Sequence, residues 1–170
     1  MVKEEQSVHY ITPPPLGIKI RARGMFDLPD FYRWLKLWLE NNSYMPDERD
    51  LEIKYIERRK PPIKNYEIEW IGEKQETTYF THKINLKMLI VAVKEAEGEW
   101  MGQKVDMEKG DAHINILGWV QTPNWENLSF LQRLYAKHIA YKRLRVEKVK
   151  LYKKVYIFQN DIKQYLGVNQ

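Results

Sequence analysis

The chain has 170 residues, of which 44% are hydrophobic and 13% aromatic, and it carries a formal net charge of +5. This length suits one domain with a substantial apolar core. Cysteine is absent, which excludes disulfide bonds, thiolate metal sites and cysteine nucleophiles. No apolar run approaches the roughly 18 residues of a membrane span, and residues 1–10 lack the apolar segment of a signal peptide. We therefore expect a cytoplasmic protein without a membrane span.

Residues 1–17 are predicted to form an N-terminal arm. The arm contains three consecutive prolines, Pro13 to Pro15, which fix a short extended segment that cannot join a helix. A single domain is expected over residues 18–170. It begins with a strand, since apolar and basic side chains alternate over residues 18–23.

An amphipathic helix is predicted directly after this strand. Asp27 is a favourable N-cap, Asp30 lies in the first turn, and Asn41 marks the end. The apolar residues of this segment share one helical face: Phe31, Trp34, Leu35, Trp38 and Leu39. Aromatic residues at this spacing are more often core residues than a ligand platform, so this face is assigned to the core.

The next part of the chain shows the two-residue alternation of β-strands. Strands are predicted over 51–56, 66–71, 77–93 and 111–121, with turn signals at 58–62, 97–98 and 109–110. The third of these strands would span roughly 55 Å if it were straight, so it must bend or carry a bulge. Its last third is apolar on both faces, and we expect both of those faces to be covered.

The longest uninterrupted pattern lies near the C-terminal end. Thr122 and Pro123 form a helix-start signal, and residues 124–166 contain neither Gly nor Pro. A helix is predicted over about 123–158, with a break near residues 158–160 and a short final helix over 160–166. Residues 124–166 carry ten Lys or Arg against three acids, so the basic character of the chain belongs to this helix.

These elements predict an α+β fold with a curved antiparallel sheet of about five or six strands, one helix in the N-terminal half and a long C-terminal helix. In this order the chain resembles the helix-grip arrangement, in which a curved sheet wraps a long C-terminal helix. It is also similar to small uncharacterised archaeal proteins in the run from Asp111 through Trp125-Glu126 and Phe130-Leu131 into the long helix. The first resemblance implies a fold, and the second implies a family but no activity.

The length of the C-terminal helix has a geometric consequence. A helix over residues 124–166 would reach about 64 Å, whereas a domain of this size is roughly 35–40 Å across. Part of the helix is therefore expected to extend beyond the domain.

No residue pattern indicates a catalytic site, a cofactor or a metal. The four histidines are His9, His82, His113 and His138, and none forms a ligand pair at helical spacing. Asp111 shares a strand face with His113, but a metal site needs further ligands that the pattern does not supply. Neighbouring acids such as Glu67 and Glu69 are interpreted as solvated strand positions. We therefore expect a non-catalytic protein.

Three functions remain open, and the preferred one is a module that self-associates or docks on a larger assembly through the C-terminal helix. Its oligomer face is predicted to contain Tyr152, Val155, Tyr156, Phe158, Ile162 and Leu166.

The two alternatives use the basic residues of the helix or the core. Sequence-independent nucleic-acid binding would use the residues Arg133, Lys137, Lys142, Arg143, Arg145, Lys148, Lys150, Lys153 and Lys154. A carrier of apolar small ligands, of helix-grip type, would have a pocket lined by Trp70, Phe80, Met88 and Trp119.

Overall fold

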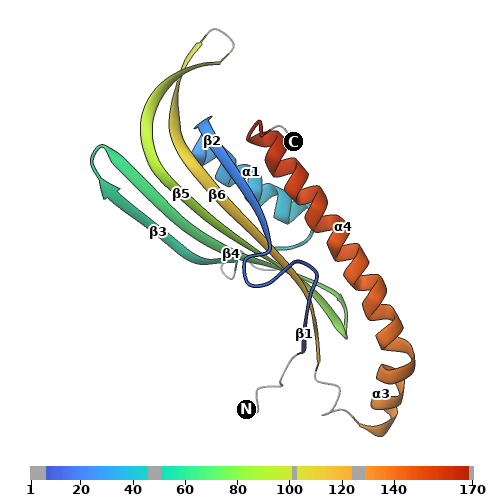
Figure 1. Ribbon diagram of the computed structural model, residues 1–170. Helices are drawn as coiled ribbons and strands as arrows, with labels where there is room; N and C mark the ends of the chain where they lie inside the picture. Colours follow the sequence, from blue (N-terminus) through green and yellow to red (C-terminus); the bar gives the residue numbers. More distant parts are fainter. Residues whose placement is uncertain (1–6, 46–50, 101–102, 124–128, 169–170) are drawn as a thin grey trace.

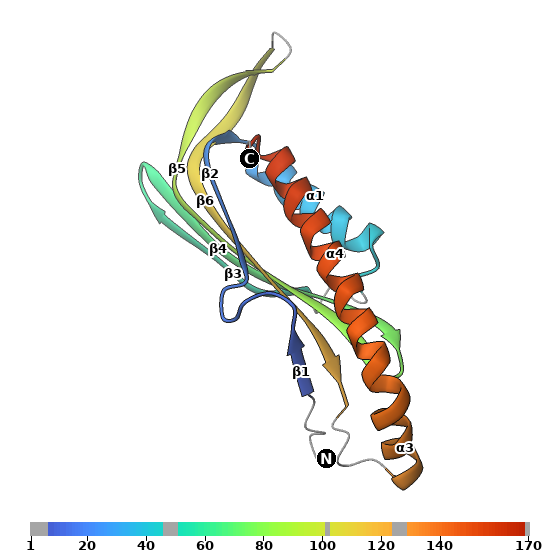
Figure 2. The ribbon, with the colours of Figure 1, turned by 45° about the vertical axis from the view of Figure 1, so that its right-hand side comes forward.

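The computed structural model describes residues 7–45, 51–100, 103–123 and 129–168. It confirms the predicted α+β fold. Within the described residues, six antiparallel strands form one open sheet, and helices cover one face of it (Figures 1 and 2).

The two longest strands of the sheet pair with each other as a hairpin, and the other strands lie on either side of it. Their bounds are β1 (Ser7–Tyr10), β2 (Ile18–Phe26), β3 (Glu52–Lys60), β4 (Ile63–Thr77), β5 (Phe80–Trp100) and β6 (Gln103–Thr122). The order across the sheet is β1-β6-β5-β4-β3, and β2 also pairs with β6. Because β1 pairs with residues 119–122 of β6 and β2 with residues 108–116, the two short strands together complete one edge of the sheet.

Part of the predicted N-terminal arm belongs to the sheet. Strand β1 lies within it, and the next residue, Ile11, donates its N–H to the carbonyl of Gly118 at 2.9 Å. The N–H of Gly118 in turn donates to the Thr12 hydroxyl at 3.0 Å. Residues 7–12 are therefore part of the domain, which the local sequence pattern does not indicate because their partners are over 100 residues away.

Strands β5 and β6 form one long, curved hairpin (Figure 1). The predicted turns at 97–98 and 109–110 are therefore wrong, since these residues lie inside paired strands. The predicted bulge is confirmed: the register shifts between Val91 and Lys94, where Ala92 has a φ of 56°. The prediction that both faces of this region are covered is wrong, because Leu89 is exposed on the uncovered face.

Helix α1 (Leu28–Asn41) begins as its sequence predicts. The Asp27 carboxylate accepts the N–H of Asp30 at 2.9 Å and caps the first turn. Of the predicted apolar face, Phe31, Leu35 and Leu39 are fully buried, while the two tryptophans are partly buried against the same core.

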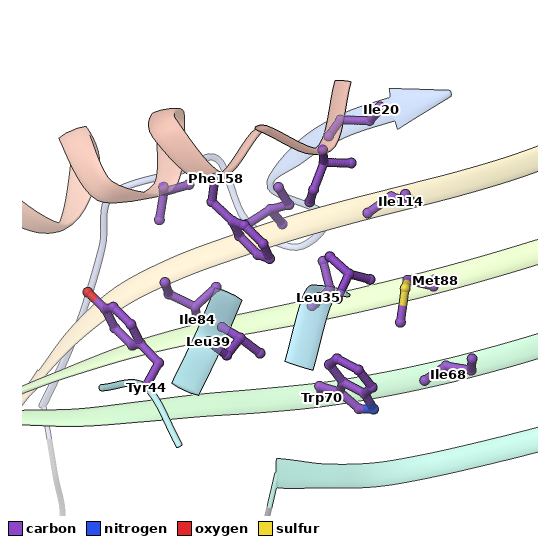
Figure 3. Packing of buried hydrophobic residues seen from close by; sticks show 14 of the residues in the cluster. Ile20, Leu35, Leu39, Tyr44, Ile68, Trp70, Ile84, Met88, Ile114 and Phe158 are labelled. Atoms are coloured by element: carbon purple, nitrogen blue, oxygen red, sulfur yellow. The ribbon is translucent and has the colours of Figure 1, made fainter. Parts of the chain in front are cut away.

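The core lies between the covered face of the sheet and the helices α1 and α4 (Tyr141–Tyr165) (Figure 3). Helix α4 contributes an apolar stripe of Leu144, Leu151, Val155, Phe158 and Ile162. The Phe158 ring stacks on Trp38 of α1 at 4.0 Å between centroids, and the Trp38 indole N–H donates to Asp161 at 2.8 Å. These contacts fix the C-terminal half of α4 to the domain.

Truncation of Phe158 should test this attachment. Phe158→Ala should lower the free energy of unfolding by about 3–5 kcal/mol, because it removes a buried ring and leaves a cavity. Tyr156→Ala, on the exposed side of the same turn, should cost less than about 1 kcal/mol. Urea denaturation measures both values, and equal losses would contradict the anchoring contact.

Candidate binding surfaces on the C-terminal helix

The C-terminal helix is continuous but not uniform. It consists of α3 (Phe130–Tyr135), a π-helical turn (Ala136–Ala140) and α4 (Figure 1). The predicted break near residues 158–160 and the separate final helix are wrong, because Phe158 and Ile162 are fully buried within one unbroken helix. The predicted start at Pro123 is also wrong: the helix begins at Phe130, and residues 124–128 lie outside the described part of the chain.

At 1.5 Å per residue, the helix over residues 130–165 is roughly 54 Å long. Its N-terminal end passes the turn between β4 and β5 and extends beyond the sheet (Figures 1 and 2). The expected overhang is therefore present, and it lies at the N-terminal end of the helix.

We define the helix tip as Phe130, Leu131 and Leu134, whose exposed fractions are 78%, 76% and 51%. No residue of α3 is buried. At its start, the Ser129 N–H and hydroxyl both lie 3.1 Å from the Gln132 side-chain oxygen, to which they donate. The tip is thus a capped helical segment whose three apolar side chains are each at least half exposed.

A groove of about 530 Å³ lies farther along the helix, between α4 and the segment that contains β1. Its lining residues are His9, Tyr10, Ile11, Tyr141, Leu144, Arg145, Lys148, Val149 and Tyr152. We call this feature the β1–α4 groove. None of the lining residues in the described part of the chain is acidic.

The charges of the groove are uncompensated. In the described part of the chain, neither Arg145 nor Lys148 lies within salt-bridge distance of a carboxylate. Burial and the nearby Lys148 ammonium both lower the pKa of His9, whose Nε2 lies 3.3 Å from the Thr122 hydroxyl. The groove is therefore an environment that disfavours positive charge and would accept an anion.

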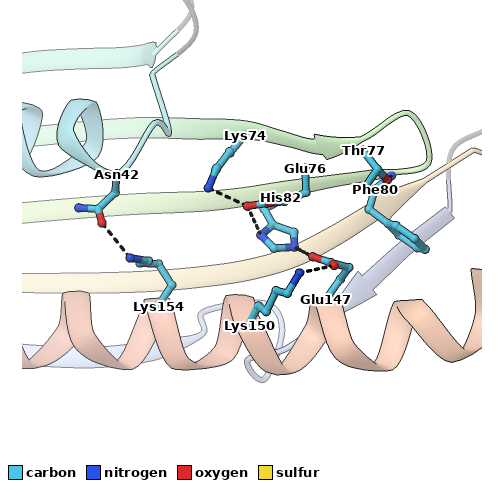
Figure 4. Close-up of polar contacts among 9 residues, drawn as sticks. All are labelled: Asn42, Lys74, Glu76, Thr77, Phe80, His82, Glu147, Lys150 and Lys154. Carbon is cyan, nitrogen blue, oxygen red and sulfur yellow. Dashed lines mark hydrogen bonds and ion pairs between the residues drawn. The ribbon is translucent and has the colours of Figure 1, made fainter.

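A group of polar residues lies where the helix meets the sheet, with His82 and Glu147 buried at its centre (Figure 4). We call this group, Lys74, Glu76, His82, Glu147 and Lys150, the polar seam. The His82 Nε2 of β5 lies 3.1 Å from a Glu147 carboxylate oxygen of α4, and its Nδ1 lies 3.8 Å from Glu76 of β4. Lys150 donates to Glu147 at 2.7 Å, and Lys74 lies 2.7 Å from Glu76. The contact between His82 and Glu147 therefore joins β5 to the helix, and the ion pairs Lys74–Glu76 and Lys150–Glu147 lie on either side of it.

The environment of the polar seam favours neutral His82. Burial lowers the pKa of His82, and this outweighs the opposite effect of the Glu76 and Glu147 carboxylates. The Lys74 ammonium lowers the pKa of Glu76, so that group is ionised at neutral pH. Burial, together with the two carboxylates, raises the pKa of nearby Tyr44, which stays protonated.

Protonation of His82 should destabilise the fold. The pKa of His82 is lower in the folded state than its ordinary 6.5, so the unfolded chain binds the proton more readily as the pH falls. The stability that neutral His82 contributes is fully present above about pH 6.5, and it is lost as the pH falls through the folded-state pKa of His82. Urea denaturation should therefore give a lower free energy of unfolding at about pH 5 than at about pH 7.5.

Two histidine variants test whether His82 causes this pH dependence. His82→Gln should show a smaller decrease between the two pH values than the wild type, whatever its absolute stability. His138→Gln, which changes an exposed histidine of the helix, should keep the wild-type decrease. If both variants behave alike, His82 is not the titrating group.

The residues of the predicted oligomer face are partly buried and partly exposed in the structure. Val155, Phe158 and Ile162 are fully buried in the core of their own domain, and Leu166 packs against that core. Tyr152 and Tyr156 are exposed, with their rings 4.4 Å apart. The predicted face is therefore wrong as a set, because tertiary packing uses its apolar residues.

The predicted basic residues are distributed around the helix. Those that are exposed are Arg133, Lys142, Arg143, Arg145, Lys150 and Lys153, and those partly exposed are Lys148 and Lys154. Lys150 is held by Glu147, and Lys154 donates to the Asn42 side chain at 2.9 Å (Figure 4). The side chain of Lys137 lies outside the described part of the chain.

The residues predicted to line an apolar pocket do not form one. Trp70, Phe80 and Met88 are buried core residues. Trp119 faces the opposite side of the sheet, where its ring lies 6.2 Å from that of Tyr10. The strand alternation explains this result, because the next residue of β6, Val120, is fully buried in the core.

Asp111 forms ion pairs on the same face of the sheet as His113. Arg21 and Arg23 lie 2.7 Å and 3.1 Å from one carboxylate oxygen, and His113 lies 3.4 Å from the other. The hydrogen bond from Arg21 is the largest cause that lowers the pKa of Asp111 to about 2. Within the described residues, no three His, Asp or Glu side chains are grouped so as to hold a metal ion.

Two features of the site were missed from the sequence. The pairing of His82 with Glu147 has a local signal: His82 alternates with Phe80 and Ile84, and Glu147 lies in the apolar stripe of its helix. An acid and a histidine that each face the core are candidates for a buried pair. The β1–α4 groove has no such signal, because it depends on the long-range pairing of β1.

Comparisons with known protein families, curated proteins and solved structures find no match. None of the described helices is long and apolar enough to cross a membrane. Function is therefore inferred from the surfaces of the chain itself.

Proposed function

We propose that this protein is a non-catalytic interaction module that self-associates through its helix tip. The exposure of Phe130, Leu131 and Leu134 is the observation that carries this proposal. Side chains of this kind stabilise a protein only when they leave water, and a contiguous apolar surface often marks a contact with another molecule.

The charge distribution favours a second copy of the chain as the partner. Arg133 is the only charged residue in α3, whereas the cations of the helix are concentrated in residues 142–154. Two tips that cross can cover each other's leucines while the cationic segments stay apart. Contact along the whole helix would instead place like charges side by side, which is unfavourable.

A contact between two identical tips also satisfies the symmetry of a dimer. In a two-fold arrangement the same surface is used by both copies, so the association closes and leaves no second apolar surface exposed. The core of each domain is complete without its partner, since α4 buries its own stripe. The proposed dimer therefore joins two folded domains.

Charge substitution at the tip should abolish self-association. Leu134→Glu places a carboxylate in the proposed contact, and the variant should be a monomer at concentrations where the wild type is a dimer. Leu37→Glu on α1 is the matched control, because Leu37 is 54% exposed and Leu134 is 51% exposed. Light scattering coupled to size exclusion measures the mass, and circular dichroism checks that both variants keep their helices.

The mass of the wild-type protein tests the proposal independently of the variants. A mass that stays monomeric as the concentration is raised into the millimolar range would refute self-association. A dimer that persists in Leu134→Glu but not in Leu37→Glu would move the contact from the helix tip to α1.

A further inference from the structure

The β1–α4 groove presents cations at a regular spacing along one side of α4. Arg145 and Lys148 follow Tyr141 by four and seven residues, and these intervals bring side chains to the same side of a helix. Neither cation has a carboxylate partner in the described part of the chain. An anion in the groove would therefore gain two attractive contacts without displacing an internal ion pair.

The same side of the helix carries aromatic rings. Tyr141 is 73% exposed and Tyr152 is 44% exposed, and both line the groove. Eleven residues separate them, which is about three helical turns or roughly 16 Å. The two cations lie between the two rings, so the side chains along the groove follow the order aromatic, cationic, cationic, aromatic.

From this arrangement we infer that the β1–α4 groove binds a single strand of nucleic acid, with Arg145 and Lys148 at phosphates and Tyr141 and Tyr152 stacked on bases. Aromatic platforms combined with a cationic track are the usual chemistry of single-strand binding without sequence preference. A duplex does not fit this chemistry, because its bases are stacked inside the helix. The groove volume of about 530 Å³ fits a short stretch of one strand.

This site is separate from the helix tip. It uses α4 and the β1 segment, whereas the tip belongs to α3. Loss of self-association in a tip variant therefore leaves the groove intact, and the two proposals can fail independently.

The charge of the groove is tested by binding of a fluorescent oligothymidylate and an oligouridylate of about 20 nucleotides at several salt concentrations. Two neutralised phosphates contribute about −1.4 to the slope of log K against log salt for a single strand. The double variant Arg145→Gln/Lys148→Gln should lose this part of the slope. The matched double variant Lys142→Gln/Lys153→Gln removes the same charge from residues that do not line the groove, and it should keep most of the slope.

The aromatic contacts are tested by Tyr141→Ala and Tyr152→Ala. Loss of one stacking ring typically weakens binding about fivefold or more. Tyr141 is the cleaner position, because its side chain is mostly exposed and its removal should not affect folding. Tyr55→Ala, an exposed tyrosine on the edge strand β3, should bind as the wild type does.

A second measurement reports on the groove itself. The imidazole of His9 lies among the groove residues, and its pKa is lowered in part by Lys148. A bound phosphate should raise the pKa of His9, which NMR titration with and without the oligonucleotide can follow. His138, which does not line the groove, serves as the internal reference.

Four results would overturn the inference. The first is no binding of the wild type at low salt, and the second is an equal loss in the two charge variants, which would indicate attraction by the whole helix. The third is equally tight binding of inorganic polyphosphate or of anionic lipid vesicles, which would show that bases contribute nothing. The fourth is an unchanged His9 titration when the oligonucleotide is bound.

Discussion

The burial of one apolar stripe of α4 against the sheet and α1 determines the rest of the structure. Leu151, Val155, Phe158 and Ile162 exclude water from this contact, and they fix both the direction of the helix and the side that it turns to the sheet. The buried residues of the helix lie between Ala136 and Ile162 and none lies in α3, so the helix projects past the sheet at its N-terminal end. The exposure of the helix tip is a consequence of this attachment, whereas the β1–α4 groove also needs the pairing of β1 with β6.

The polar seam constrains how α4 is oriented on the sheet. Apolar packing alone would constrain this orientation less. Burial of the Glu147 carboxylate is costly unless the group keeps polar partners, and His82 and Lys150 are those partners. A shifted or rotated helix would, however, separate Glu147 from His82 of β5 and leave both buried groups without this partner. We interpret the seam as a constraint on the register between helix and sheet.

Much of the fold follows from local patterns, while the surfaces depend on contacts that such patterns do not contain. The cap of α1, the bulge in β5 and the overhanging helix were predicted from periodicity and length. Gly98 resembles a turn residue, but it lies within a strand where a Cβ would come within 2.3 Å of Met107. The predicted break near residues 158–160 is absent, because burial of Phe158 and Ile162 keeps the helix continuous. The groove could not be predicted, because β1 pairs with residues more than 100 positions away.

The π-helical turn changes the rotation of the helix tip about the helix axis relative to α4. A π-turn is equivalent to one residue inserted into an α-helix. Deleting a residue there would restore a regular helix and rotate α3 by about 100° around the helix axis relative to α4. A one-residue change within residues 136–140 would thus alter the direction in which the helix tip faces relative to α4.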